Sequence, residues 1–177
     1  MKSPRVIIPG IFIGLLMLLG IVAEGQDSEN SRSRLFVEYI NTVNTIQFNS
    51  GGQIKHFDRG LRVAARNRNR SLRDMLLEDT RSVLFGVIED LKSIKPPEGF
   101  EKYHDELLNT YIYRSLATES LLSNDLDSAS KLNRASQASN VRALEKLINI
   151  MSANGAPSDM VDAMARKLES AKYALER

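Results

Sequence analysis

The sequence predicts an all-α fold: an elongated antiparallel four- or five-helix bundle that follows an N-terminal signal or anchor helix. Apolar residues recur at the i, i+3, i+4, i+7 spacing of amphipathic helices along most of the chain after residue 34, and no stretch shows the alternation typical of a strand. Glycine and proline pairs divide this pattern, such as Gly51 with Gly52 and Pro96 with Pro97. The short connections between segments favour antiparallel neighbours within one domain.

The N-terminal segment predicts export. Residues 6–23 form an apolar run behind Lys2 and Arg5, as in a secretory signal peptide or a retained membrane anchor. Positive charges precede the run and acidic residues follow it, which places the N-terminus in the cytoplasm and residues 26–177 outside. We therefore expect an exported protein that is periplasmic, cell-surface or secreted.

The residues that follow the apolar run fit both cleavage of this segment and its retention in the membrane. Ala23 and Gly25 supply the small residues that a signal peptidase needs for a cut after residue 25. At about 1.5 Å per residue, the run also just crosses a bilayer of roughly 30 Å as a single transmembrane helix. We favour cleavage by a small margin. Residues 1–25 are thus a signal peptide or a single membrane anchor, and residues 26–177 an extracytoplasmic helical bundle.

The first two helices are predicted from apolar periodicity and its interruptions. Helical spacing from Phe36 to Ile46 predicts a first helix that Gly51 and Gly52 end. A second pattern runs from about residue 53 to residue 95 without a proline. The polar stretch at residues 67–71 is where we expect this long helix to bend or to pack weakly.

Three further helices follow the paired prolines. Proline is tolerated in the first turn of a helix, so Pro96 and Pro97 close one helix and open another that runs to about residue 123. Asp125 is a suitable N-cap for a helix over residues 125–152. The stop signal at residues 154–157 precedes a final helix that begins near Ser158.

A short resemblance supports this compartment and fold. Residues 94–108, IKPPEGFEKYHDELL, carry paired prolines before a helix that contains a histidine. This stretch resembles a helical-hairpin turn in uncharacterised exported bacterial helical proteins. The resemblance implies an extracytoplasmic helical hairpin and transfers no functional residue.

Composition excludes several classes of function. The chain has no cysteine, which excludes disulfides, thiol catalysis, Cys-type zinc sites and a lipidated N-terminal cysteine. The 24 basic and 22 acidic residues nearly cancel, so the global charge gives no reason to expect a nucleic-acid partner. No phosphate loop or nucleophile motif is present in the sequence. We therefore predict no catalytic residue, no cofactor and no enzymatic activity.

One pair of residues matches half of a metal-binding element. Glu101 and His104 have the Glu-x-x-His spacing of di-iron carboxylate bundles, which need two such elements and two more glutamates. The other histidine, His56, lacks a glutamate at the corresponding position. We therefore expect no metal site, and expect His104 to pack between helices beside Tyr103 and Leu107.

The strongest local signal is a stripe of basic residues at spacings of three and four within the predicted second helix. We call it the basic stripe: Lys55, Arg59, Arg62, Arg66, Arg70 and Arg73. At 100° per residue these residues share one face of a helix. Arginine binds oxyanions through paired donors, so the five arginines are the candidate anion-binding residues.

The alternative is that the basic stripe is a solvated face, partly neutralised within the fold. If the chain folds back at Pro96 and Pro97, Glu119 comes near Arg73, and Asp125 and Asp127 come near Arg66 and Arg68. The same register brings Arg114 to Glu78 and Asp79. This complementarity favours the structural interpretation, although each exposed bridge contributes only about 0 to 1 kcal/mol.

The sequence thus predicts a non-enzymatic binding or scaffolding protein at the cell envelope, whose partner is an unidentified protein or envelope component, with the membrane as a further partner if the N-terminal segment is retained. The alternative is an extracytoplasmic sensor-type bundle that binds a small ligand or an anionic polymer through the basic stripe.

Overall fold

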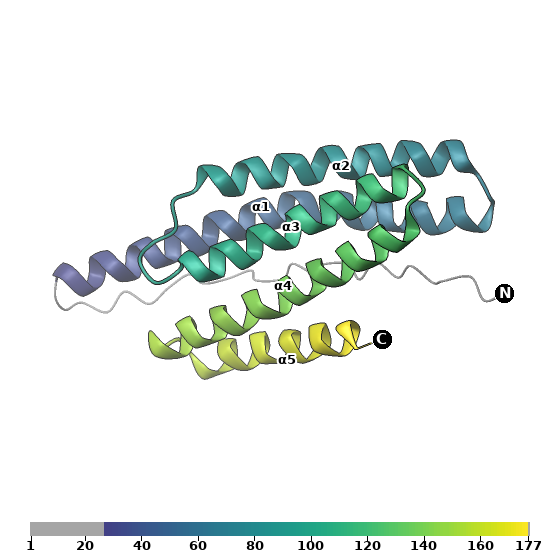
Figure 1. Cartoon of the computed structure of the whole chain (residues 1–177). Helices are drawn as coiled ribbons and strands as arrows, with labels where there is room; N and C mark the ends of the chain where they lie inside the picture. The colour runs from purple at the N-terminus through teal and green to yellow at the C-terminus, as the bar shows by residue number, and fades with distance from the viewer. Residues whose placement is uncertain (1–26, 177) are drawn as a thin grey trace.

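A computed structural model of the protein describes residues 27–176, with side chains from Arg34 onward, and this range is all-α (Figure 1). Five helices lie in this range: α1 (Asp27–Arg66), α2 (Arg70–Ser93), α3 (Glu101–Leu122), α4 (Leu126–Ala153) and α5 (Ser158–Leu175). The predicted signal or anchor segment lies outside the described residues. None of the helices within 27–176 combines the length and apolarity that a bilayer crossing requires.

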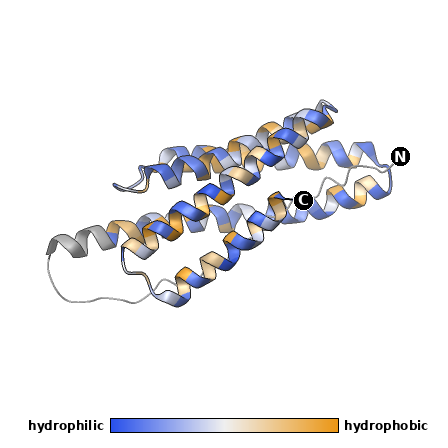
Figure 2. Cartoon of the chain, turned by 60° about the horizontal axis from the view of Figure 1, so that its bottom comes forward, coloured by the Kyte–Doolittle hydropathy of each residue, from blue (hydrophilic) through white to orange (hydrophobic). Residues whose placement is uncertain are grey.

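The helices form an elongated bundle in which each packs against the next along the chain. α3 is central, since it contacts both α2 and α4, and its side chains also reach α1. The turns that join α1 to α2 and α3 to α4 lie at one end of the bundle, and the α2–α3 and α4–α5 connections lie at the other (Figure 1). Hydrophilic and hydrophobic residues alternate along every helix (Figure 2), as amphipathic helices require.

The prediction that Gly51 and Gly52 end the first helix is wrong, because α1 continues through both glycines to Arg66. A glycine inside a helix costs roughly 0.5 to 1 kcal/mol. Buried side chains on both sides of the pair, including Val43, Ile54 and Ala64, keep one face of α1 against the core. Burial of this continuous face outweighs the cost of the two glycines.

The prediction of one long helix over residues 53–95 is also wrong, since the polar stretch makes a complete reversal. α1 ends at Arg66 and α2 begins at Arg70, so the helices form an antiparallel hairpin. Arg68 adopts a left-handed conformation, with φ of 52°. The side chain of Asn69 then caps α2 by accepting a hydrogen bond from the Leu72 amide at 3.0 Å.

The ends of α2, α3 and α4 and the starts of α4 and α5 lie within two residues of the prediction. Two starts differ from it. α1 begins at Asp27, before Phe36, and α3 begins at Glu101, because residues 94–100 form a connection and the paired prolines do not open the helix.

α2 stops before Pro96 and Pro97. Asp125 caps α4 by accepting a hydrogen bond from the Ser128 amide at 3.0 Å. Gly155, with φ of 68°, supplies the left-handed residue between α4 and α5.

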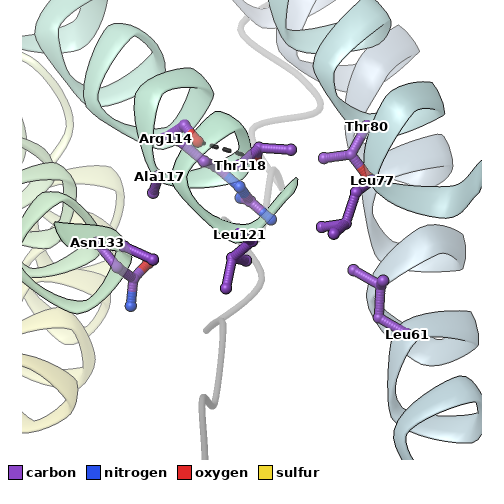
Figure 3. A pocket seen from close by; sticks show the side chains of 9 residues that line it. Leu61, Leu77, Thr80, Arg114, Ala117, Thr118, Leu121 and Asn133 are labelled. Atoms are coloured by element: carbon purple, nitrogen blue, oxygen red, sulfur yellow. Dashed lines mark hydrogen bonds between the residues drawn. The ribbon is translucent and has the colours of Figure 1, made fainter. Parts of the chain in front are cut away.

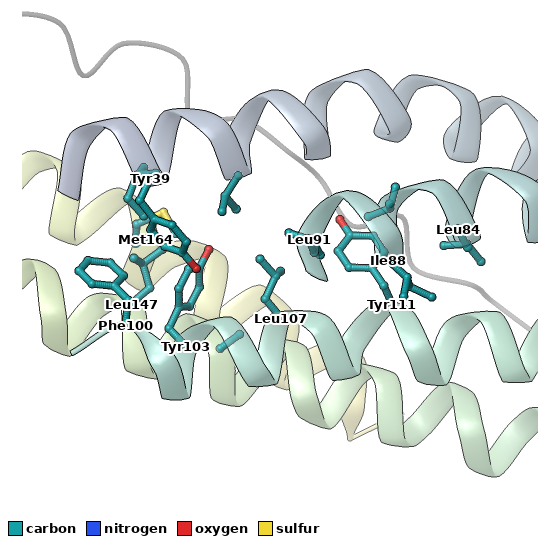
Figure 4. Packing of buried hydrophobic residues seen from close by; sticks show 14 of the residues in the cluster. Tyr39, Leu84, Ile88, Leu91, Phe100, Tyr103, Leu107, Tyr111, Leu147 and Met164 are labelled. Carbon is teal, nitrogen blue, oxygen red and sulfur yellow. The ribbon is translucent and has the colours of Figure 1, made fainter. Parts of the chain in front are cut away.

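The hydrophobic core is richest in rings near the α2–α3 connection, a region we call the aromatic end. Phe36 and Tyr39 of α1 meet Phe100, at ring-centroid distances of 5.0 and 5.2 Å, and Tyr103 lies 6.4 Å from Tyr39. Each of these pairs is edge-to-face, the arrangement that aromatic rings prefer. Leu147 and Met164 bring α4 and α5 to the same cluster (Figure 4).

The opposite end, around the α1–α2 turn, has a different interior, and we call it the basic end. Its buried apolar side chains are leucines and alanines, including Leu76, Leu77 and Ala117. A buried ion pair between Asp58 and Arg114 lies among them.

Candidate functional site

The basic stripe lies at the surface of the basic end and is divided between two helices. Lys55, Arg59, Arg62 and Arg66 are exposed along α1. The α1–α2 turn follows, and Arg70, at the first position of α2, is also exposed.

The favoured interpretation of the basic stripe, neutralisation within the fold, is wrong in its proposed pairs. Within residues 34–176, the structure contains no ion pair of Arg59, Arg62, Arg66 or Arg70 with a carboxylate within 4.0 Å. Arg73 is half-buried and pairs with its sequence neighbour Asp74, with 2.7 Å between Nη2 and Oδ1.

The predicted partners of these arginines have other contacts. Glu78 pairs with Arg81 along α2, at 2.6 Å between Oε2 and Nη2. Asp125 is used as the N-cap of α4. Glu78 and Asp125 are therefore engaged within α2 and α4, and the four exposed arginines have no carboxylate within 4.0 Å in the described part of the chain.

Arg114 does not reach Glu78 or Asp79, because it points into the bundle toward Asp58 of α1. Its Nη2 lies 3.1 Å from Asp58 Oδ2 and 3.3 Å from Oδ1. Only 5% and 4% of the Arg114 and Asp58 side chains are exposed, so this ion pair is removed from water.

The buried pair explains why the stripe carries so much unbalanced charge. Asp58 lies within the basic stretch of α1 but faces inward, so its carboxylate neutralises Arg114. Burial raises the pKa of Asp58, and the positive charges of Arg114 and Arg62 oppose that rise. The acid nearest to the stripe in sequence is therefore used inside the bundle.

A small cavity lies beside this ion pair (Figure 3). It has a volume of about 20 Å³ and is lined by Arg114, Thr118, Leu77 and Asn133, with five further residues from the surrounding helices. The Thr118 hydroxyl donates to the Arg114 carbonyl at 3.0 Å. This volume has room for one water molecule.

A second buried polar contact lies at the aromatic end. The Tyr39 hydroxyl and His104 Nδ1 are 2.9 Å apart, and His104 is buried between α1 and α3, which agrees with its predicted packing. Burial lowers the pKa of His104, whereas the charge of Asp105 and a hydrogen bond with the Leu91 backbone oppose this.

The Glu-x-x-His residues are not assembled into a metal-binding pair. Glu101 is exposed and accepts a hydrogen bond from the Gly99 amide at 2.9 Å, while His104 contacts Tyr39 in the core. His56 is exposed on α1. Within the part of the chain that the structure describes, no three histidine, aspartate or glutamate side chains gather closely enough to hold a metal ion.

Sequence reasoning missed the Asp58–Arg114 pair, although a signal was present. Asp58 is four residues after Ile54 and three before Leu61, and Arg114 is three residues after Tyr111. Both charged residues thus lie on apolar faces of their helices, a position in which charges are retained only when paired.

Comparison with known proteins identifies no relative: no protein family, curated protein or solved structure matches this chain.

Proposed function

We propose that this chain is a non-enzymatic binding protein of the cell envelope, and that its basic stripe holds an anionic polymer. The observation that carries the proposal is the exposure of Arg59, Arg62, Arg66 and Arg70, which form no ion pair within residues 34–176. Three of these guanidinium groups share one face of α1 and the fourth begins α2. Such clustered charge raises the local concentration of anions, and each arginine offers paired donors to an oxyanion.

The position of the basic stripe fits a partner beyond the membrane. The apolar run at residues 6–23 supports export, as a cleaved signal or as an anchor. If it is retained, α1 begins directly after it and, with 40 residues, extends about 60 Å. The basic end lies at the far end of α1 from that segment, which suits a partner in the envelope beyond the membrane.

A binding role is favoured over chemistry at the buried titratable groups, since Asp58 and His104 are already engaged with Arg114 and Tyr39. A polymer on the surface is favoured over a small ligand between the helices, because the cavity beside Arg114 holds about 20 Å³.

The test is salt-dependent binding of the full chain, purified in a mild detergent, to an immobilised anionic polymer. The variant replaces Arg59, Arg66 and Arg70 with glutamine. Arg62 is kept because its charge opposes the raised pKa of Asp58. We expect affinity to fall by about 10- to 100-fold at low salt, with a logarithmic salt slope smaller by about two to three.

A matched control removes the same number of charges elsewhere. Lys95, Lys102 and Arg166 are exposed and lie outside the basic stripe, so their replacement by glutamine keeps the net charge equal to that of the test variant. We expect the control to retain the salt slope of the unmodified chain. Equal weakening in both variants, or no binding by the unmodified chain, would refute the proposal.

A further inference from the structure

The basic stripe continues toward the middle of α1 as an uncharged surface. Counting back from Arg66, positions 62, 59, 55, 52 and 48 follow at alternating intervals of four and three residues. At 100° per residue this spacing keeps all six positions on one line along the helix. Phe48 and Gly52 therefore extend the face that carries the basic residues.

Both added residues are open to solvent. Phe48 is 62% exposed, the highest value among the large exposed hydrophobic residues of the described chain. A Cβ atom built on Gly52 would meet nothing within 4 Å. Gly52, which has no side chain, thus leaves a depression in the surface between the ring of Phe48 and the basic residues.

We propose that this extended face binds a linear acidic polysaccharide, with its carboxylate or sulfate groups on the arginines and the apolar face of one sugar against Phe48 above Gly52. This inference rests on the proposed function and names its class of polymer. From position 48 to position 66 the face is about 27 Å long, which accommodates several consecutive sugars.

The combination of groups favours a sugar polymer over a phosphate-only polymer. Phosphate chains expose charge and little apolar surface, so they offer no group that packs against an exposed aromatic ring. A sugar ring presents C–H groups on one face, and these pack against the apolar face of an aromatic side chain. Gly52 leaves room for a sugar at that point.

A membrane surface fits this face less well. Helices that lie in the membrane interface bury a continuous apolar side, whereas the apolar side of α1 is already packed in the core through Tyr39, Val43 and Ile54. Along the outer line, Phe48 is the single aromatic residue, and glycine and basic residues occupy the other positions.

The experiment compares two polymers of matched charge number, polygalacturonate and inorganic polyphosphate, on the full chain in detergent. Phe48→Ala removes the ring, and Phe48→Tyr retains it. Phe85→Ala is the matched control, because Phe85 of α2 is 61% exposed and lies outside the stripe. Both residues are exposed, so we expect each alanine variant to keep the melting temperature of the unmodified chain.

We expect Phe48→Ala to lower affinity for polygalacturonate about fivefold, as loss of a partly buried apolar contact implies, with polyphosphate binding unchanged. Phe48→Tyr and Phe85→Ala should bind both polymers normally. No effect of Phe48→Ala, or an equal effect on both polymers, would overturn the polysaccharide inference. In either case, arginine-dependent polyphosphate binding would leave the proposed function intact, while loss of arginine dependence for both polymers would refute that function itself.

Discussion

The two ends of the bundle bury polar groups in opposite ways. At the aromatic end, neutral groups are hydrogen-bonded among rings, with Tyr39 on His104 and edge-to-face contacts around them. At the basic end, a full ion pair between Asp58 and Arg114 lies beside a water-sized cavity and small side chains. We infer that the aromatic end supplies most of the packing, and that the basic end depends on one electrostatic contact.

The same contrast accounts for the surface. At the basic end Asp58 faces inward and pairs with Arg114, so its carboxylate does not neutralise the exposed arginines. At the aromatic end the buried contact between Tyr39 and His104 uses no carboxylate. A charged surface and a buried ion pair beside a water-sized cavity therefore occur together, at the end where we place the ligand.

The largest effect should come from breaking the buried ion pair. We expect Asp58→Ala to lower the free energy of unfolding by about 3 to 5 kcal/mol, because it leaves the Arg114 guanidinium buried without a counter-charge. Urea denaturation measures this. Glu89→Ala, which removes the exposed partner of Lys92, should cost no more than about 1 kcal/mol.

The double variant Asp58→Leu with Arg114→Met tests whether charge is the cause. Replacing a buried ion pair by apolar groups of similar size is often neutral or stabilising. We therefore expect the double variant to unfold at a higher urea concentration than Asp58→Ala. If Asp58→Ala is no less stable than Glu89→Ala, the basic end does not depend on this pair, and the comparison between the two ends fails.

Much of the fold was predictable because local chemistry decides it. Paired prolines cannot continue a helix, and Asp125 is a strong N-cap. The end of α2 and the start of α4 could therefore be placed from the sequence. Gly51 and Gly52 misled the prediction because burial on both sides of a glycine pair overrides its low helix propensity. The turn at residues 67–69 has Arg68 in a left-handed conformation. Arginine has no preference for this conformation, so the sequence did not predict the turn.

The exposure of the arginines was predictable from the sequence, and their charge partners were not. The spacing of the arginines placed them on one face of a single helix. The structure keeps four of them exposed but divides them between α1 and α2. Their partners depended on which faces of α1, α2 and α3 meet, a tertiary property. The prediction considered only the register between the two helices joined at Pro96 and Pro97. It therefore missed the pairing of Arg114 with Asp58, which lies on α1.

A smaller effect is expected from pH at the aromatic end. Burial lowers the pKa of His104 below the ordinary value of 6.5, so the unfolded chain binds a proton that the folded chain rejects. Stability from this group is complete above about pH 6.5 and falls as pH decreases, by at most about 1.4 kcal/mol per pH unit. Between pH 7 and 5.5 we therefore expect the free energy of unfolding to decrease.

The control for this prediction is a difference between variants. Asp58, whose raised pKa acts in the opposite direction, is present in both chains when His104→Gln is compared with the unmodified protein. We expect His104→Gln to show a flatter dependence of stability on pH, and His56→Gln, at an exposed site, to follow the unmodified chain. If the stability of His104→Gln and of the unmodified chain changed with pH in parallel, burial at the aromatic end would not disfavour protonation of His104.

The smallest effects should come from two glycines of α1 that report how tightly the helices approach. Gly52→Ala has free space and gains helix propensity, so we expect stabilisation of about 0.5 to 1 kcal/mol. A Cβ on Gly60 would lie 2.8 Å from Cδ1 of Leu76, which is itself buried. We expect Gly60→Ala to be destabilised by about 1 kcal/mol, since overpacking exceeds the gain in propensity.

Thermal unfolding of the two alanine variants measures how rigidly α1 and α2 meet at the basic end. Opposite signs would mean that Leu76 cannot retreat, and that the basic end is closely packed along the α1–α2 contact even though its interior beside Arg114 holds a cavity. Equal stabilisation of both variants would mean that the hairpin opens at little cost. The basic end would then be the softer end throughout, and the ion pair between Asp58 and Arg114 would be what holds α1 against α3 there.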